Sequence, residues 1–135
     1  MAWRNGNRTV SRSSSDRHPV KSLFVLNDGP YGSERPCNAL RLAGALAKAP
    51  ENDVRVLLLG EAAGCAKAEP KVPEGYYNFQ RMLGRVARHR GTVATCGTCM
   101  DARGIAETEL AQRVQRGTLD ELTQWTQWAD KVLVF

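Results

Sequence analysis

Short apolar runs of strand length alternate along this chain with segments whose apolar residues recur at helical spacing. Residues 22–27 hold a continuous apolar stretch, which is typical of a strand covered on both faces. Residues 53–60 and 131–135 form similar runs, and helical patterns occupy 34–48 and 76–89. Because strands that alternate with helices build βαβ units, the pattern predicts an α/β fold. The expected architecture has three layers, α/β/α, around a mostly parallel five-stranded sheet.

The remaining elements are shorter. Residues 92–95 are β-type and give the third strand, a short helix is expected over 61–67, and a fourth strand over 112–115. Thr118 and Glu121 form a capping-box pattern that opens a last helix, in which Leu119, Leu122, Trp125 and Ala129 share one side.

Length and charge limit the classes of protein. With 135 residues the chain suits one domain, expected over residues 20–135 after a disordered basic tail at 1–19. The tail carries four arginines and one aspartate, +3 of the net +5, which leaves only +2 for the domain. No Lys/Arg cluster with interleaved aromatics is evident, so we expect no nucleic-acid partner. No apolar run is long enough to span a membrane, and we expect no membrane partner.

Four cysteines occur without a secretory signal, which favours a cytoplasmic protein with reduced thiols. The Arg- and Ser-rich start also suits an organelle transit peptide, but a tail is favoured over that alternative.

Two of these cysteines form the pair Cys96-Gly97-Thr98-Cys99 directly after the third predicted strand. Carboxyl ends of parallel strands open onto the ligand crevice, and a thiol at a helix start ionises readily. We expect Thr98 to cap a helix that begins at Cys99, and Arg103 to supply a positive charge to either sulfur. The alternatives are a tight turn with two buried cysteines, and a zinc site.

Zinc is disfavoured because the other possible ligands are scattered: Cys37, Cys65, His89 and His18. We expect no metal and no cofactor. The loop after the first strand contains Gly29, Pro30, Tyr31, Gly32 and Ser33 and opens a helix. If strands one and three are neighbours, this loop lines the same substrate crevice as Cys96, Gly97 and Thr98.

Two segments resemble the DsrE/DsrF-like family. Residues 28–43 resemble its first loop and helix, and residues 96–105, Cys-Gly-Thr-Cys-Met-Asp-Ala-Arg-Gly-Ile, resemble the segment with its sulfur-accepting cysteine. The ending at 129–135 also fits, so the resemblance covers residues 20–135. It implies an α/β/α domain, homotrimers or homohexamers, and relatives such as DsrE and TusD that pass sulfur between partner proteins as a cysteine persulfide.

By its spacing to the Arg-Gly pair, Cys96 matches the family's acceptor cysteine, whereas Cys99 belongs to the less characterised YchN-like branch. The resulting hypothesis is a sulfurtransferase-like carrier. Cys96 holds the sulfur, Cys99 resolves or assists, and Arg103 lowers the pKa of the thiolate. Two alternatives stay open: a dithiol redox protein that uses Cys96 and Cys99, and a non-enzymatic oligomer that binds a small ligand.

Overall fold

The computed structural model describes residues 18–68, 72 and 76–135. The predicted basic tail therefore lies outside the described residues except for its last two positions. Within the described ranges, no helix combines the length and the apolar character that crossing a bilayer requires.

Five strands form one sheet, and every pair of neighbours is parallel. Its spatial order is β4-β3-β2-β1-β5. The strands are β1 (Val20–Leu26), β2 (Asn52–Leu58), β3 (Thr92–Cys96), β4 (Val114–Gly117) and β5 (Lys131–Val134). The predicted α/β class and five-stranded sheet are thus confirmed. Since all strands run the same way, their carboxyl ends lie at one edge of the sheet, where a ligand crevice forms in such folds.

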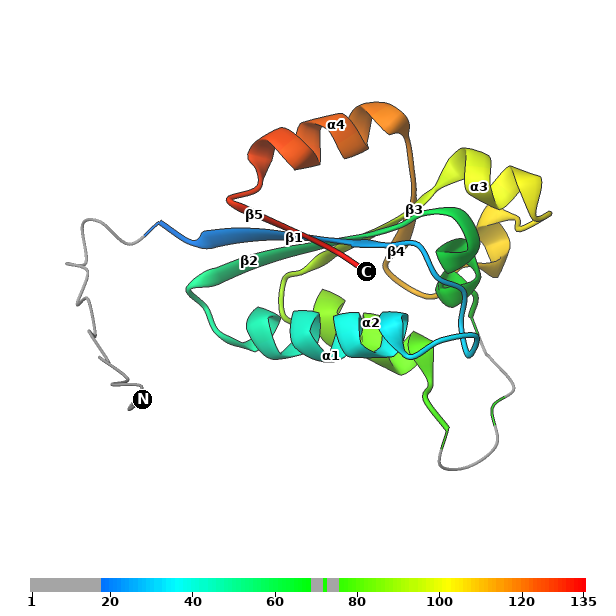
Figure 1. The fold of residues 1–135 in the computed structure, drawn as a ribbon, viewed down its shortest axis with the longest axis horizontal. Helices are drawn as coiled ribbons and strands as arrows, with labels where there is room; N and C mark the ends of the chain where they lie inside the picture. Colours follow the sequence, from blue (N-terminus) through cyan, green and yellow to red (C-terminus); the bar gives the residue numbers. More distant parts are fainter. Residues whose placement is uncertain (1–17, 69–71, 73–75) are drawn as a thin grey trace, which may run out of the picture.

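Helices cover both faces of the sheet (Figure 1). The helices α1 (Arg35–Lys48) and α2 (Phe79–Arg88) lie together on one face, and α4 (Leu119–Trp128) lies on the other. The larger core packs alternate residues of β1 and β2, such as Phe24 and Val56, against α1 and α2. The smaller core packs the opposite alternation, such as Leu23 and Leu57, against Trp125 of α4. Alternate strand residues point to opposite faces, so a continuous apolar run serves both cores.

Short helices occupy the carboxyl edge and its connections. The 3₁₀ segments are η2 (Gly60–Ala66) and η3 (Glu107–Glu109), and the six-residue α3 (Gly97–Ala102) follows β3 directly. The predicted cap of α4 is confirmed in part. The Thr118 hydroxyl accepts a hydrogen bond from the backbone N–H of Glu121 at 3.2 Å, while the Glu121 carboxylate accepts one from Gln115 instead.

Three local expectations are wrong. β2 lies between β1 and β3, so the first and third strands are not neighbours. The fourth strand occupies Val114–Gly117, two residues later than expected, because the chain turns at Arg113 with φ at 68°. Leu119, expected on the packed side of α4, is 74% exposed because it stands at the first position of the helix, at the edge of the sheet.

Candidate functional site: a thiol pair at the end of β3

Cys96 is the last residue of β3 and the N-cap residue of α3. Its backbone is extended (φ −61°, ψ 121°), and the helix begins at the next residue, Gly97. The expected helix start at Cys99 with a Thr98 cap is therefore wrong. The strand leads straight into the helix, so Cys96 occupies the cap position that was expected for Thr98. The unpaired backbone N–H groups of the first turn therefore lie beside the Cys96 sulfur.

The half-buried Cys96 thiol has a lowered pKa. Burial alone would raise that pKa, but hydrogen bonds to the sulfur outweigh it: from the side chains of Thr98 and Cys99 and from the backbone N–H groups of the same two residues. The Thr98 hydroxyl lies 3.2 Å from the Cys96 sulfur. Hydrogen bonds to the charged form stabilise it, so the site favours a thiolate on Cys96.

Cys99 has the opposite tendency. Burial raises the pKa of its thiol, and the hydrogen bond that it gives to Cys96 raises it further. The backbone N–H of Gly60 and the charge of Arg103 lower it by less. The Arg103 guanidinium donates to the carbonyl oxygen of Cys99 at 3.1 Å, so Arg103 acts on Cys99 and on the end of α3. The pair therefore consists of a thiolate-forming Cys96 and a proton-holding Cys99.

The other two cysteines lie in the core. Burial raises the pKa of the Cys65 thiol to about 12 and raises that of Cys37 as well. Both stay protonated near neutral pH and are poor nucleophiles. Among the described residues, no three His, Cys, Asp or Glu side chains are grouped as metal ligands.

Cys96 opens into a cavity of about 330 Å³ on the α4 side of the sheet. Its apolar wall consists of leucines from β2, the residue after it and α4: Leu57, Leu59, Leu119 and Leu122. Its polar side is formed by Cys96, Thr98, Thr118 and Arg116. Predominantly apolar walls with a few placed polar groups are typical of small-ligand sites.

Among the described residues, Arg116 is the cation that lines this cavity, and no sequence pattern pointed to it. Its guanidinium donates two hydrogen bonds to the Asp101 carboxylate, at 2.9 and 2.8 Å, and lies 3.8 Å from Glu107. Its hydrogen bonds lower the pKa of Asp101. A Cβ built on Gly97 would stand 2.7 Å from Nε of Arg116, so only glycine lets the guanidinium cross the start of α3. The approach of Arg116 to α3 follows from the strand register, which pairs Thr95 with Arg116. A fourth strand expected two residues earlier does not predict this register.

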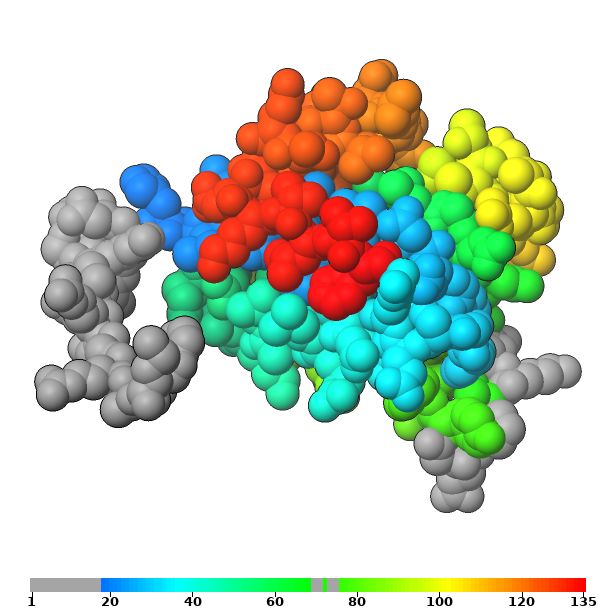
Figure 2. All heavy atoms as spheres, viewed as in Figure 1, coloured from blue at the N-terminus to red at the C-terminus, as the bar shows by residue number. Residues whose placement is uncertain are grey.

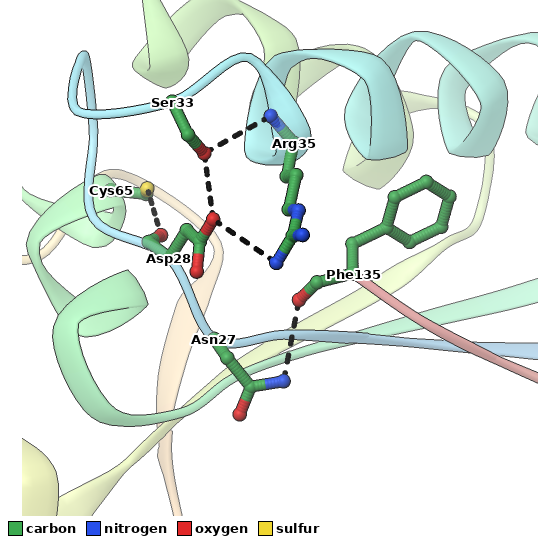
Figure 3. Close-up of polar contacts among 6 residues, drawn as sticks. All are labelled: Asn27, Asp28, Ser33, Arg35, Cys65 and Phe135. Carbon is green, nitrogen blue, oxygen red and sulfur yellow. Dashed lines mark hydrogen bonds and ion pairs between the residues drawn. The ribbon is translucent and has the colours of Figure 1, made fainter.

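The loop after β1 does not line this cavity. Instead it packs against η2: Pro30 lies against Gly64, and the Cys65 thiol contacts the Asp28 carbonyl oxygen (Figure 3). Figure 3 also shows the Asp28 carboxylate accepting a hydrogen bond from Ser33 at 2.7 Å and facing Arg35 at 3.9 Å. The loop residues Gly29, Pro30, Tyr31, Gly32 and Ser33 therefore lie apart from Cys96, Gly97 and Thr98, with β2 and η2 between them.

The DsrE/DsrF-like family matches residues 20–135. The chain belongs to the DsrE/DsrF-like family. Within this family, the protein YchN of Escherichia coli K12 is 45% identical over 116 residues, which cover 85% of this chain and 98% of YchN. An uncharacterized protein of Methanocaldococcus jannaschii is 31% identical and is covered over its full length.

Solved structures show the same architecture. The crystal structure of YchN from E. coli superposes with a TM-score of 0.79 at 42% identity and covers 86% of this chain and 99% of that one. A conserved protein of unknown function from Bacteroides thetaiotaomicron has a TM-score of 0.59 at 16% identity, a likeness of fold alone.

Proposed function

We propose that this protein is a cytoplasmic sulfur carrier that holds a persulfide on Cys96 and passes the sulfur to a partner protein. The observation that carries the proposal is the division of the thiol pair into a hydrogen-bonded Cys96 with a lowered pKa and a Cys99 that keeps its proton. Membership of the DsrE/DsrF-like family supports a sulfur-relay role.

The transfer needs no cofactor. The Cys96 thiolate attacks the outer sulfur of a donor persulfide, a new S–S bond forms on Cys96, and the donor leaves as a thiolate. The Thr98 hydroxyl and the first N–H groups of α3, which stabilise the thiolate, also suit the ionised persulfide that results. An acceptor thiolate then attacks the outer sulfur and regenerates the Cys96 thiolate.

Mass spectrometry after incubation with a cysteine desulfurase and cysteine tests the carrier role. Wild type and Cys99→Ser are expected to gain one sulfur atom that dithiothreitol removes, and Cys96→Ser is expected to gain none. Cys99→Ser is the matched control because it keeps the Cys96 contacts with Thr98 and the backbone. Equal sulfur gain by wild type and Cys96→Ser, or no gain by any of them, contradicts the proposal.

A dithiol redox role is the second candidate, favoured by the side-chain hydrogen bond between Cys99 and Cys96. In that chemistry the Cys99 sulfur attacks Cys96 of the persulfide, a Cys96–Cys99 disulfide forms and sulfide leaves. Its signature is a reversible disulfide without retained sulfur in wild type, together with lasting sulfur retention in Cys99→Ser.

We also propose that the protein is a homo-oligomer, a trimer or hexamer as the family resemblance implies. Val132 and Val134 of β5 pair with Leu23 and Val25 of β1 and so share the face that α4 covers elsewhere. They are nevertheless 45% and 66% exposed. Figure 2 shows β5, in red, on the open surface between α4 and α1. Two neighbouring exposed valines on an edge strand suit burial against another copy.

A further inference from the structure

Four arginines line a second hollow, on the other side of the molecule's sheet from the Cys96 cavity. This arginine groove has a volume of about 730 Å³ and lies between α2 and the turn that precedes β4. Its charged lining consists of Arg81, Arg85, Arg88 and Arg113, and the rest consists of Asn78, Gln80, Gly84 and Gln112. Neither Cys96 nor Cys99 is among its lining residues, so the groove is separate from the thiol pair.

Helical spacing places three of these side chains on one stripe. Arg81, Arg85 and Arg88 stand at positions i, i+4 and i+7 of α2, over about 10 Å of helix axis. Like charges at this spacing destabilise a helix, and no carboxylate among the described lining residues offsets them. Within the described residues, none of the four arginines forms an ion pair. The arginine cluster is therefore not explained by a contribution to the stability of the fold.

Two backbone features shape the groove. Gly84 lies inside α2, where glycine is unfavourable, yet a Cβ there would meet nothing within 4 Å. Its missing side chain leaves the floor open between the arginines. Arg113 has a φ of 68°, a conformation that glycine and asparagine adopt far more readily. Such strain in a non-glycine residue is typical of functional positions.

The groove is also prepared for a ligand. The aliphatic stem of Arg85 lies against Gly44 of α1, where a Cβ would stand 3.2 Å from its Cδ, so the Arg85 stem packs between the two helices while its side chain lines the groove. Guanidinium groups bind phosphate oxygens in a bidentate manner. Among the residues that the structure describes, no aromatic or aliphatic side chain lines the groove, so a base, an acyl chain or an apolar peptide side chain finds no partner in them.

From these observations we propose that the arginine groove binds a compact multivalent phosphate anion, a di- or triphosphate group. A ligand that is nearly all charge suits a lining dominated by arginine and amide side chains. The volume falls within the range of small-molecule sites.

Isothermal titration calorimetry with inorganic triphosphate at fixed ionic strength tests this. Wild type is expected to bind, and Arg85→Gln and Arg113→Gln each to bind about tenfold more weakly, the loss of one charge-assisted hydrogen bond. Arg35→Gln is the matched control, since Arg35 lies at the start of α1 beside Asp28, outside the groove. Gly84→Ala is expected to bind more weakly while unfolding at a higher temperature, which a purely structural glycine would not do.

Further ligands test the chemistry of the site. Adenosine triphosphate is expected to bind as well as inorganic triphosphate, because the described lining residues offer a base no stacking partner. Three results overturn the proposal: no triphosphate binding, an equal loss in Arg35→Gln, or tighter binding of a charge-matched oligonucleotide or acidic peptide through the same arginines.

Discussion

The four cysteines of this chain differ in acidity. Cys37 and Cys65 are buried and stay protonated, Cys99 donates its hydrogen bond, and Cys96 receives several. The difference arises from a few neighbouring groups, of which the Thr98 hydroxyl is the one that substitution can remove most cleanly.

Thr98→Val is expected to raise the pKa of Cys96, because the hydroxyl that stabilises the thiolate is lost while the shape of the side chain is kept. Alkylation at neutral pH should slow about threefold to tenfold, the range for one hydrogen bond. The titration is followed by the ultraviolet absorbance of the thiolate. Thr98→Ser, which retains the hydroxyl, should titrate like wild type. Coincident curves for Thr98→Val and wild type would contradict the assigned role.

At the scale of elements, the site depends on β3, α3 and β4. The apolar runs and their alternation predicted the strands and helices, because burial on both faces of a parallel sheet leaves a strong pattern. The start of α3 was predicted too late, since Thr98 looks like a cap in sequence but its hydroxyl binds the Cys96 sulfur. The cation at the cavity was assigned to Arg103 alone, because Arg116 comes from another strand and its contact depends on register.

The ion pair between Arg116 of β4 and Asp101 of α3 can be tested through the pKa of Asp101. Arg116→Gln is expected to raise the pKa of the Asp101 carboxyl toward its ordinary range, because its hydrogen bonds are lost. Gly97→Ala should give the same shift without touching either partner, since the added methyl displaces the guanidinium. Carbon-13 NMR of the carboxyl measures both. Arg103→Gln is the control and should leave Asp101 unchanged. A low pKa that persists in Gly97→Ala would contradict the close approach.

Of the described part of the molecule, α4 is the helix packed on one face of the sheet, and β5 is left there with exposed valines. The sequence could not show this, because Val132 and Val134 belong to an apolar run that reads as a buried strand. Only the strand order places β5 at an edge.

Val134→Lys is expected to dissociate the proposed oligomer, since a charge on that surface would be buried at the contact between copies. Native mass spectrometry and sedimentation measure the assembly. Leu42→Lys is the matched control, because Leu42 is a single exposed apolar residue on α1, on the other face of the sheet. A wild type that stays monomeric at all concentrations, or equal dissociation by both variants, would contradict the assignment of the surface.

Cys96 forms the thiolate of the pair and Cys99 holds the proton. The alkylation rate of each cysteine as a function of pH, resolved by peptide mass spectrometry, measures this difference. We predict that Cys96 reacts rapidly with a pKa below that of an ordinary thiol, that Cys99 reacts only at higher pH, and that Cys37 and Cys65 are protected. Equal profiles for Cys96 and Cys99, or a Cys96 that reacts no faster than the buried thiols, would contradict it.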